Sequence, residues 1–113
     1  MHIHVTAVEN TAIVALHGRF LGDKDVDDFC EKIRECLENG NTKVVIDLTH
    51  VDYINSMGLG ALIAGYLIAK NSGGLLAYAS GNPRVNELLH LTKTDQTVPV
   101  FASVEDARNM LMG

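Results

Sequence analysis

Ser56 is the residue whose type and position most favour chemistry in this chain. It follows a short apolar run at residues 43–48 and an expected loop, and it precedes two closely spaced glycines, Gly58 and Gly60. A serine at a strand-to-helix junction either caps the helix through its hydroxyl or accepts a phosphate group beside free backbone N–H groups. Glycine in the first turns of a helix costs up to about 1 kcal/mol relative to alanine, so the two glycines suggest that something approaches the backbone closely. The cap and the phosphate acceptor both remain open interpretations of Ser56.

Nucleophilic catalysis and metal binding are poorly supported by the same residues. The GxSxG elbow of serine hydrolases is absent because isoleucine stands two positions before Ser56, and only His50 shares its expected loop. His2 and His4 share one face of an expected strand, but no third ligand is evident and HExxH is absent. No glycine-rich phosphate-binding loop occurs either. We therefore expect no catalytic residue, no metal site, no cofactor and no enzymatic activity.

Composition excludes several other classes of protein. The chain has 113 residues, 47% of them hydrophobic, and a net charge of −5, which argues against nucleic acid as a partner. No apolar run reaches the roughly 18 residues of a membrane span, and no signal-peptide pattern opens the sequence, so we expect no membrane insertion. Cys30 and Cys36 lie six positions apart on one expected helix, where they point in different directions. Two reduced thiols, with Cys30 in the core, are typical of a cytoplasmic protein.

The hydrophobic pattern predicts strands alternating with helices. Strands are expected at residues 3–8, 13–17, 43–48, 75–79 and 98–101, and helices at residues 23–38, about 57–70, from 83 onward and from 103 onward. Residues 49–55 are expected to form a loop. Pro99 places the last strand at a sheet edge, because proline cannot donate to a strand ladder. The pattern predicts a single small α/β domain over residues 1–113, with a mixed, mostly parallel sheet of about five strands and four helices.

Residues 44–62, VVIDLTHVDYINSMGLGAL, resemble the central motif of the STAS domains, the family of bacterial anti-sigma factor antagonists. Residues 16–19, 73–76, 83–92 and 103–107 show weaker likeness to the same family, so the resemblance covers nearly the whole chain. It implies a STAS-like fold and a serine that is phosphorylated by a kinase, which is itself the anti-sigma factor. The unphosphorylated form would bind that kinase and free the sigma factor. By position the acceptor is Ser56, and the expected contact residues are Asn55, Ser56, Met57, Gly58 and Leu59.

Two residues beside the acceptor depart from the family pattern. Asn55 stands where aspartate is usual, and Met57 stands where a second serine is common. They favour an alternative in which the chain is a non-phosphorylated STAS scaffold, or an accessory subunit of a signalling assembly or of a lipid or anion transporter. An enzyme acting on a nucleotide or ester ranks last. The resemblance implies a GHKL-type anti-sigma factor serine kinase and a PP2C-type phosphatase as partners, and leaves a homodimer open.

Charge is unevenly distributed around the motif. Residues 21–38 carry seven acidic and three basic side chains, whereas residues 55–93 carry one glutamate and three basic side chains. An acidic run is usually a solvated helix face. A phosphate on Ser56 would nevertheless change the local field strongly, because its own segment carries little negative charge.

Overall fold

Five strands form one sheet in the order β1-β2-β3-β4-β5, in a computed structural model that describes residues 1–112. β1 runs antiparallel to β2, and β2, β3, β4 and β5 run parallel to one another. The strands are β1 (His2–Val8), β2 (Thr11–Phe20), β3 (Lys43–Ile54), β4 (Leu75–Ala79) and β5 (Val100–Phe101). The helices are α1 (Asp23–Glu38), α2 (Ser56–Asn71), α3 (Pro83–Leu91) and α4 (Val104–Met112), with a short 3-10 turn, η1 (Thr94–Gln96). The predicted α/β domain with a mixed, mostly parallel sheet is confirmed.

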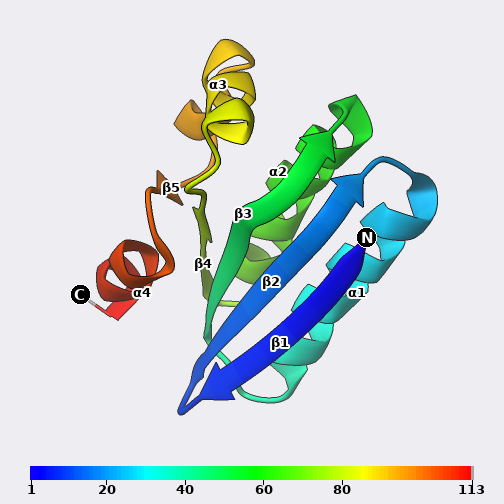
Figure 1. Cartoon of the computed structure of the whole chain (residues 1–113). Helices are drawn as coiled ribbons and strands as arrows, with labels where there is room; N and C mark the ends of the chain where they lie inside the picture. Colours follow the sequence, from blue (N-terminus) through cyan, green and yellow to red (C-terminus); the bar gives the residue numbers. More distant parts are fainter. Residues whose placement is uncertain (113) are drawn as a thin grey trace.

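The main core lies between the sheet and the pair of helices α1 and α2, which cover one face (Figure 1). β2 alternates strictly, so that Val14 and Leu16 are fully buried toward these helices while Ile13 and Ala15 face the other way. Phe20 and Phe29 meet edge to face in this core, with ring centroids 5.3 Å apart. Cys30 and Cys36 are both buried in α1, so the predicted core position of Cys30 is confirmed.

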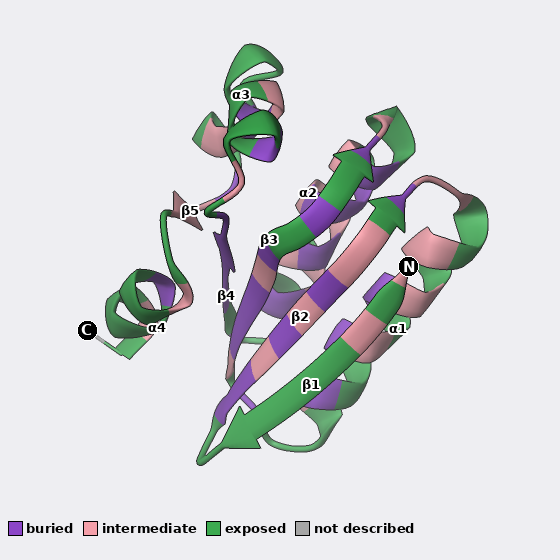
Figure 2. Ribbon diagram, viewed as in Figure 1, coloured by how far each residue is buried: buried purple, intermediate pink, exposed green. Residues whose placement is uncertain are grey.

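The opposite face of the sheet is only partly covered. α4 packs Ala107 against Val45, Ala77 and Ala79, which form a second, smaller core. β1 is exposed along nearly its whole length, and the side of β2 and β3 away from α1 and α2 is partly open (Figure 2). We call this side of β1, β2 and β3 the outer face.

α3 lies beyond the carboxyl ends of the central strands, and β5 lies beside the carboxyl end of β4 (Figure 1). The predicted start of α3 is confirmed, because the Asn82 side chain accepts a hydrogen bond from the backbone N–H of Arg84 and Pro83 is the first helical residue. β5 pairs only with β4, so the predicted edge position is also confirmed, although the strand has two residues and begins after Pro99. No helix of residues 1–112 is long and apolar enough to cross a membrane.

The predicted loop at residues 49–55 is wrong. β3 continues to Ile54, through a register irregularity against β2 between the pairs Ala15–Asp47 and His17–His50. In its second half Val51 and Ile54 are buried and the other residues are exposed, because only one side of this part of the sheet is covered. The two buried residues lie three positions apart, not two, because the register against β2 shifts again between Gly18 and Arg19. A single residue, Asn55, therefore separates the longest strand from α2.

Candidate functional site

Ser56 is the first residue of α2 and its side chain is exposed. It lies at the carboxyl ends of the parallel strands, where α/β sheets commonly place their functional residues. β3 ends at Ile54, so only Asn55 separates Ser56 from the sheet. The structure therefore presents Ser56 on a rigid junction between a strand and a helix.

Asn55, not Ser56, caps the helix. The Asn55 side chain accepts a hydrogen bond from the backbone N–H of Gly58 at 3.0 Å and donates another to the carbonyl of Leu21 at 2.7 Å. The backbone N–H of Asn55 also donates to the carbonyl of Phe20, at 3.2 Å. The interpretation of Ser56 as the cap is wrong, because asparagine is an equally good capping residue and stands one position earlier. The capping role leaves the Ser56 hydroxyl free for another use.

An asparagine caps α3 with the same pair of hydrogen bonds. Asn82 accepts from the backbone N–H of Arg84 at 3.0 Å and donates to the carbonyl of Val51 at 2.8 Å. Each asparagine thus caps its own helix and ties it to the chain at a neighbouring strand: β3 for Asn82, and the residue after β2 for Asn55. An aspartate in either place would keep the acceptor and lose the donor. Asparagine at residue 55 therefore makes one hydrogen bond, to the Leu21 carbonyl, that an aspartate could not make.

The two glycines after Ser56 have different roles. Gly58 is buried, and a Cβ there would lie 2.9 Å from the carbonyl oxygen of Phe20 and 2.5 Å from the side chain of Ile54. The close approach expected at Gly58 is thus made by the fold itself, and this residue lies beneath the surface that we predicted it to line. Gly60 is exposed and a Cβ there would meet nothing within 4 Å. Space for a partner therefore exists at Gly60 but not at Gly58.

Exposed apolar side chains surround the serine. Met57 is 44% exposed and Tyr53 is 51% exposed, while Leu59 is partly buried against the core. The guanidinium of Arg19 lies 5.5 Å from the ring centroid of Tyr53, in the position of a cation–π contact. We call Arg19, Tyr53, Ser56 and Met57 the α2-start surface. Sequence reasoning missed Arg19 and Tyr53, which only the pairing of β2 with β3 brings together.

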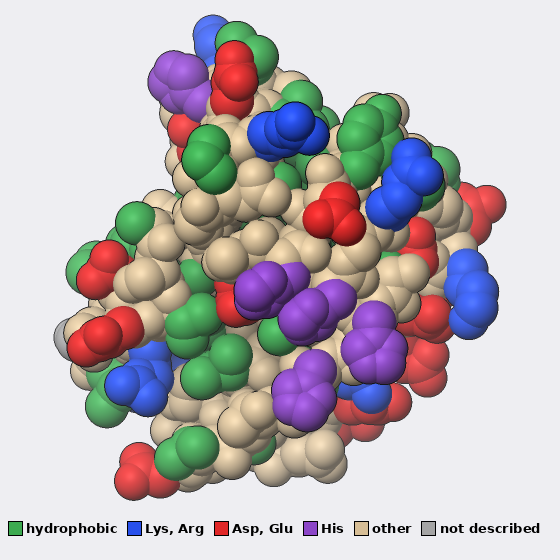
Figure 3. Space-filling model, viewed as in Figure 1, with side chains coloured by type: hydrophobic (Ala, Val, Ile, Leu, Met, Phe, Trp, Pro, Cys, Tyr) green, Lys and Arg blue, Asp and Glu red, His purple; other side chains and the backbone are tan. Residues whose placement is uncertain are grey.

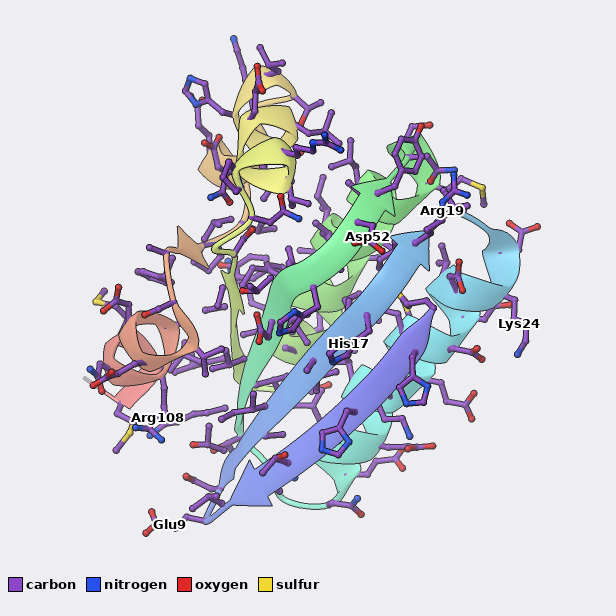
Figure 4. The ribbon with its side chains drawn as sticks, in the orientation of Figure 1. Glu9, His17, Arg19, Lys24, Asp52 and Arg108 are labelled. Atoms are coloured by element: carbon purple, nitrogen blue, oxygen red, sulfur yellow. The ribbon has the colours of Figure 1, made fainter. Side chains whose placement is uncertain are left out.

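A shallow hollow of about 240 Å³ adjoins this surface between β3 and α3. It is lined by Asp52, Tyr53, Ile54, Arg84, Val85 and Leu88. Arg19 and Asp52 mark the same end of the sheet in Figure 4. The surface thus combines aromatic, aliphatic and charged groups, which is the composition of a protein-binding patch more than of a small catalytic pocket.

His50 does not reach Ser56 as a catalytic base. Its ring stacks on His17 of β2, with centroids 4.8 Å apart, and His17 belongs to the outer face. α2 packs on the other side of the sheet. Within residues 1–112, no cluster of three or more histidine, cysteine, aspartate or glutamate side chains is arranged to hold a metal ion.

The chain is similar to known proteins in both sequence and structure. The family model of the STAS domain matches residues 2–107. A protein of Thermotoga maritima, described as a candidate anti-sigma factor antagonist, is 32% identical over 73 residues, which are 65% of each chain. That alignment spans just under two thirds of the relative's length.

Solved structures align along nearly the whole chain. An anti-sigma factor antagonist from Mycobacterium paratuberculosis superposes with a TM-score of 0.84 at 22% identity, over 99% of this chain and 94% of the other. The anti-sigma factor antagonist SpoIIAA, in its unphosphorylated form, superposes with a TM-score of 0.71 at 16% identity, over 99% of both chains. At these identities the superpositions establish the fold. Together with the family model, they show that this chain belongs to the STAS domain family.

Proposed function

We propose that this STAS domain is an anti-sigma factor antagonist whose binding is switched by phosphorylation of Ser56. In this proposal the unphosphorylated chain binds an anti-sigma factor that is also a serine kinase, and so releases a sigma factor. It acts as a binding protein and not as an enzyme. The family membership supports the general role, and the name of the Thermotoga maritima relative agrees with it.

The observation that carries the proposal is that Asn55 caps α2, whereas the Ser56 side chain is exposed and is not needed for the cap. Asn55 satisfies the start of α2, so phosphorylation of Ser56 removes no capping hydrogen bond from the fold. The Ser56 hydroxyl is exposed, so a kinase has access to it. The positive end of the α2 dipole and its remaining free N–H groups tolerate a phosphate at this position.

The neighbouring residues explain how such a phosphate would end binding. A partner that packs on Met57 and Tyr53 excludes water from the serine between them in sequence. A phosphoserine carries about −1.5 to −2 charges at neutral pH, and burying it in a packed contact without basic partners is strongly unfavourable. The domain need not change shape. SpoIIAA has been solved in both an unphosphorylated and a phosphorylated form, which shows that this fold accommodates both states in that protein.

The proposal includes the remaining components of the switch. A PP2C-type phosphatase would restore the free serine, and the cycle would run in the cytoplasm, where the buried thiols of Cys30 and Cys36 stay reduced. The partner kinase is expected to be of the GHKL type, as the family resemblance implies.

The test compares serines at the two ends of the same helix. Ser56→Asp and Ser56→Ala are made alongside Ser72→Asp and Ser72→Ala, because Ser72 is an exposed serine at the carboxyl end of α2. Binding to the histidine-kinase-like anti-sigma factors of the native host is measured by titration calorimetry. We expect Ser56→Asp to abolish binding, Ser56→Ala to bind like the wild type, and both Ser72 variants to bind normally.

A kinase assay completes the test. Incubation with the bound anti-sigma factor and ATP should add the mass of one phosphate group to the wild type and none to Ser56→Ala. If Ser56→Asp binds as tightly as the wild type, the phosphorylation switch is wrong and the α2-start surface is a constitutive docking site, as in the scaffold alternative.

A further inference from the structure

Histidines gather on the outer face of the sheet, away from the α2-start surface. His2 and His4 belong to β1, His17 to β2 and His50 to β3. Figure 3 shows their side chains clustered over these three strands, and Figure 4 places His17 in the middle of this face. The remaining histidine, His90, lies on α3 and contacts Asp95 instead.

Strand register places three of these residues in one row. His2 pairs with His17 across the antiparallel ladder, and His17 pairs with His50 across the parallel one. Side chains of directly paired residues lie on one face, with Cβ atoms about 5 Å apart. The rings of His17 and His50 are in fact stacked, with centroids 4.8 Å apart and planes inclined by only 3°.

The adjacent row adds a fourth imidazole and a carboxylate. His4 pairs with Ala15, which in turn pairs with Asp47. Because alanine has no side chain beyond Cβ, longer neighbours can lean over Ala15 from both sides. His4 and Asp47 thus flank Ala15 in the row next to that of His2, His17 and His50.

This face is accessible to a ligand. His2, His4 and His50 are exposed and His17 is partly exposed. α1 and α2 pack on the opposite side of the sheet. α4 packs on β3, β4, β5 and Ile13 and borders the turn between β1 and β2. None of these histidines is used by the proposed phosphorylation switch.

Imidazole is the ligand preferred by borderline divalent transition metals such as Zn²⁺, Ni²⁺ and Cu²⁺. Parallel stacked rings direct their nitrogens side by side and not toward one point, and within residues 1–112 no three such groups already surround one position. Rotation about χ2 of an exposed histidine is soft, however, because this torsion has a broad distribution. A shared ion requires neighbouring rings in one row to rotate until their nitrogens meet it.

We propose that His17 and His50, together with His2, form a surface site for one divalent transition-metal ion, with water completing its coordination. The nearby carboxylate of Asp47 favours the positive charge. An ion held in this way joins three strands, including β1, which otherwise pairs only with β2. The site is a ligand site of the sheet and is separate from the α2-start surface.

The experiment titrates the whole chain with ZnCl₂ and NiCl₂ in a buffer that does not chelate metals. The wild type is compared with the double variant His17→Ala/His50→Ala and with the matched control His90→Ala. We expect one ion per chain for the wild type and for His90→Ala. The double variant should bind at least tenfold more weakly, since loss of even a supporting group costs a metal site about 10- to 100-fold.

Two further measurements separate the site from non-specific binding. Zn²⁺ should raise the midpoint of thermal unfolding of the wild type and of His90→Ala, but not of the double variant, because a ligand of the folded state stabilises it. In NMR spectra, Ni²⁺ should broaden the ring signals of His17 and His50 while those of His90 persist. Equal binding by the wild type and the double variant, or loss of binding in His90→Ala, would overturn the proposal. A stoichiometry of half an ion per chain with a dimer in light scattering would also overturn it, because the ligands would then come from two copies.

Discussion

The side-chain amide of Asn55 donates to the carbonyl oxygen of Leu21, 2.7 Å away, while its own oxygen accepts from the start of α2. This one side chain therefore joins the end of the β2 region to the helix that carries Ser56. Only one orientation of the amide makes both hydrogen bonds, because one needs a donor and the other an acceptor.

Replacement of Asn55 tests the two bonds separately. Asn55→Ala should lower the free energy of unfolding by about 1–2 kcal/mol, since it removes the cap and leaves the Leu21 carbonyl without its side-chain donor. Asn55→Asp keeps the cap but faces the Leu21 carbonyl with a carboxylate, so a loss of about 1 kcal/mol is expected. Urea unfolding at pH 7 measures both, with the exposed Asn109→Asp as a control that should change little. Equal stability of Asn55→Asp and the wild type would show that the bond to Leu21 contributes nothing.

Gly58 and Gly60 should respond in opposite ways to the same substitution. Gly58→Ala forces a methyl group against the Phe20 carbonyl and Ile54, and should cost about 1–3 kcal/mol of unfolding free energy. Gly60→Ala enters open space and should stabilise the chain by up to about 1 kcal/mol, because alanine favours the helix. Urea unfolding measures the free energy of unfolding of both variants. A Gly58→Ala variant as stable as the wild type would contradict the packing described for the start of α2.

Asp25 should make stability depend on pH. Its carboxylate accepts from the backbone N–H of Leu21 at 3.1 Å, and this hydrogen bond chiefly lowers the pKa of Asp25, helped by the Met1 ammonium 3.5 Å away and opposed by burial. Because the folded pKa is lowered, the unfolded state binds more protons, so the contribution is full above the ordinary carboxyl value. It is lost as the pH falls through the lowered pKa.

Two variants in α1 isolate this effect. At pH 7, Asp25→Ala should reduce the free energy of unfolding by about 1 kcal/mol, and the gap to the wild type should close as the pH falls below the ordinary carboxyl pKa of about 3.9. Asp27→Ala, at an exposed position of the same helix, should show a much smaller gap. Chemical unfolding across this pH range provides the measurement, and a gap for Asp25→Ala that stays constant with pH would exclude the ionised carboxylate as its cause.

The two cysteines should be unreactive in the folded chain. Cys30 is 8% exposed and Cys36 is 3% exposed, and burial raises the pKa of both thiols. Since the thiolate is the reactive form, a disulfide reagent such as DTNB should modify neither cysteine in the native state and both after unfolding in guanidinium. Rapid modification of either thiol under native conditions would mean that α1 opens locally.

Most of the fold followed from hydrophobic periodicity, and the deviations have identifiable causes. The bounds predicted for α1 and β4 match the structure, because their apolar residues recur at clear helical or continuous spacing. The sequence predicts the end of β3 at Leu48, because the second half of this strand is covered on one side only and buries every third residue, a spacing that periodicity does not associate with a strand. The sequence does not predict η1, because this turn depends on a left-handed conformation at Lys93 (φ 58°), and lysine is not a residue type that favours that conformation.

The candidate site was predicted in part. Ser56 could be singled out by its place between a strand and a helix, but the identity of the cap could not, since Asn55 and Ser56 are both good capping residues. The contact between Arg19 and Tyr53 and the row of histidines could not be predicted from the sequence. Each grouping depends on which residues are paired between neighbouring strands. Periodicity predicts which residues share a face of one strand, but not which residue lies opposite them on the next.

The single residue between β3 and α2 has a consequence for the proposed phosphorylation of Ser56. Many phosphorylation sites lie in flexible segments that a kinase pulls into its active site as an extended peptide. Ser56 lies between a twelve-residue strand and a sixteen-residue helix, so its backbone cannot become extended without unfolding one of them. A kinase that modifies Ser56 has to recognise the surface of the folded domain. We therefore expect a synthetic peptide of the same sequence to be a poor substrate.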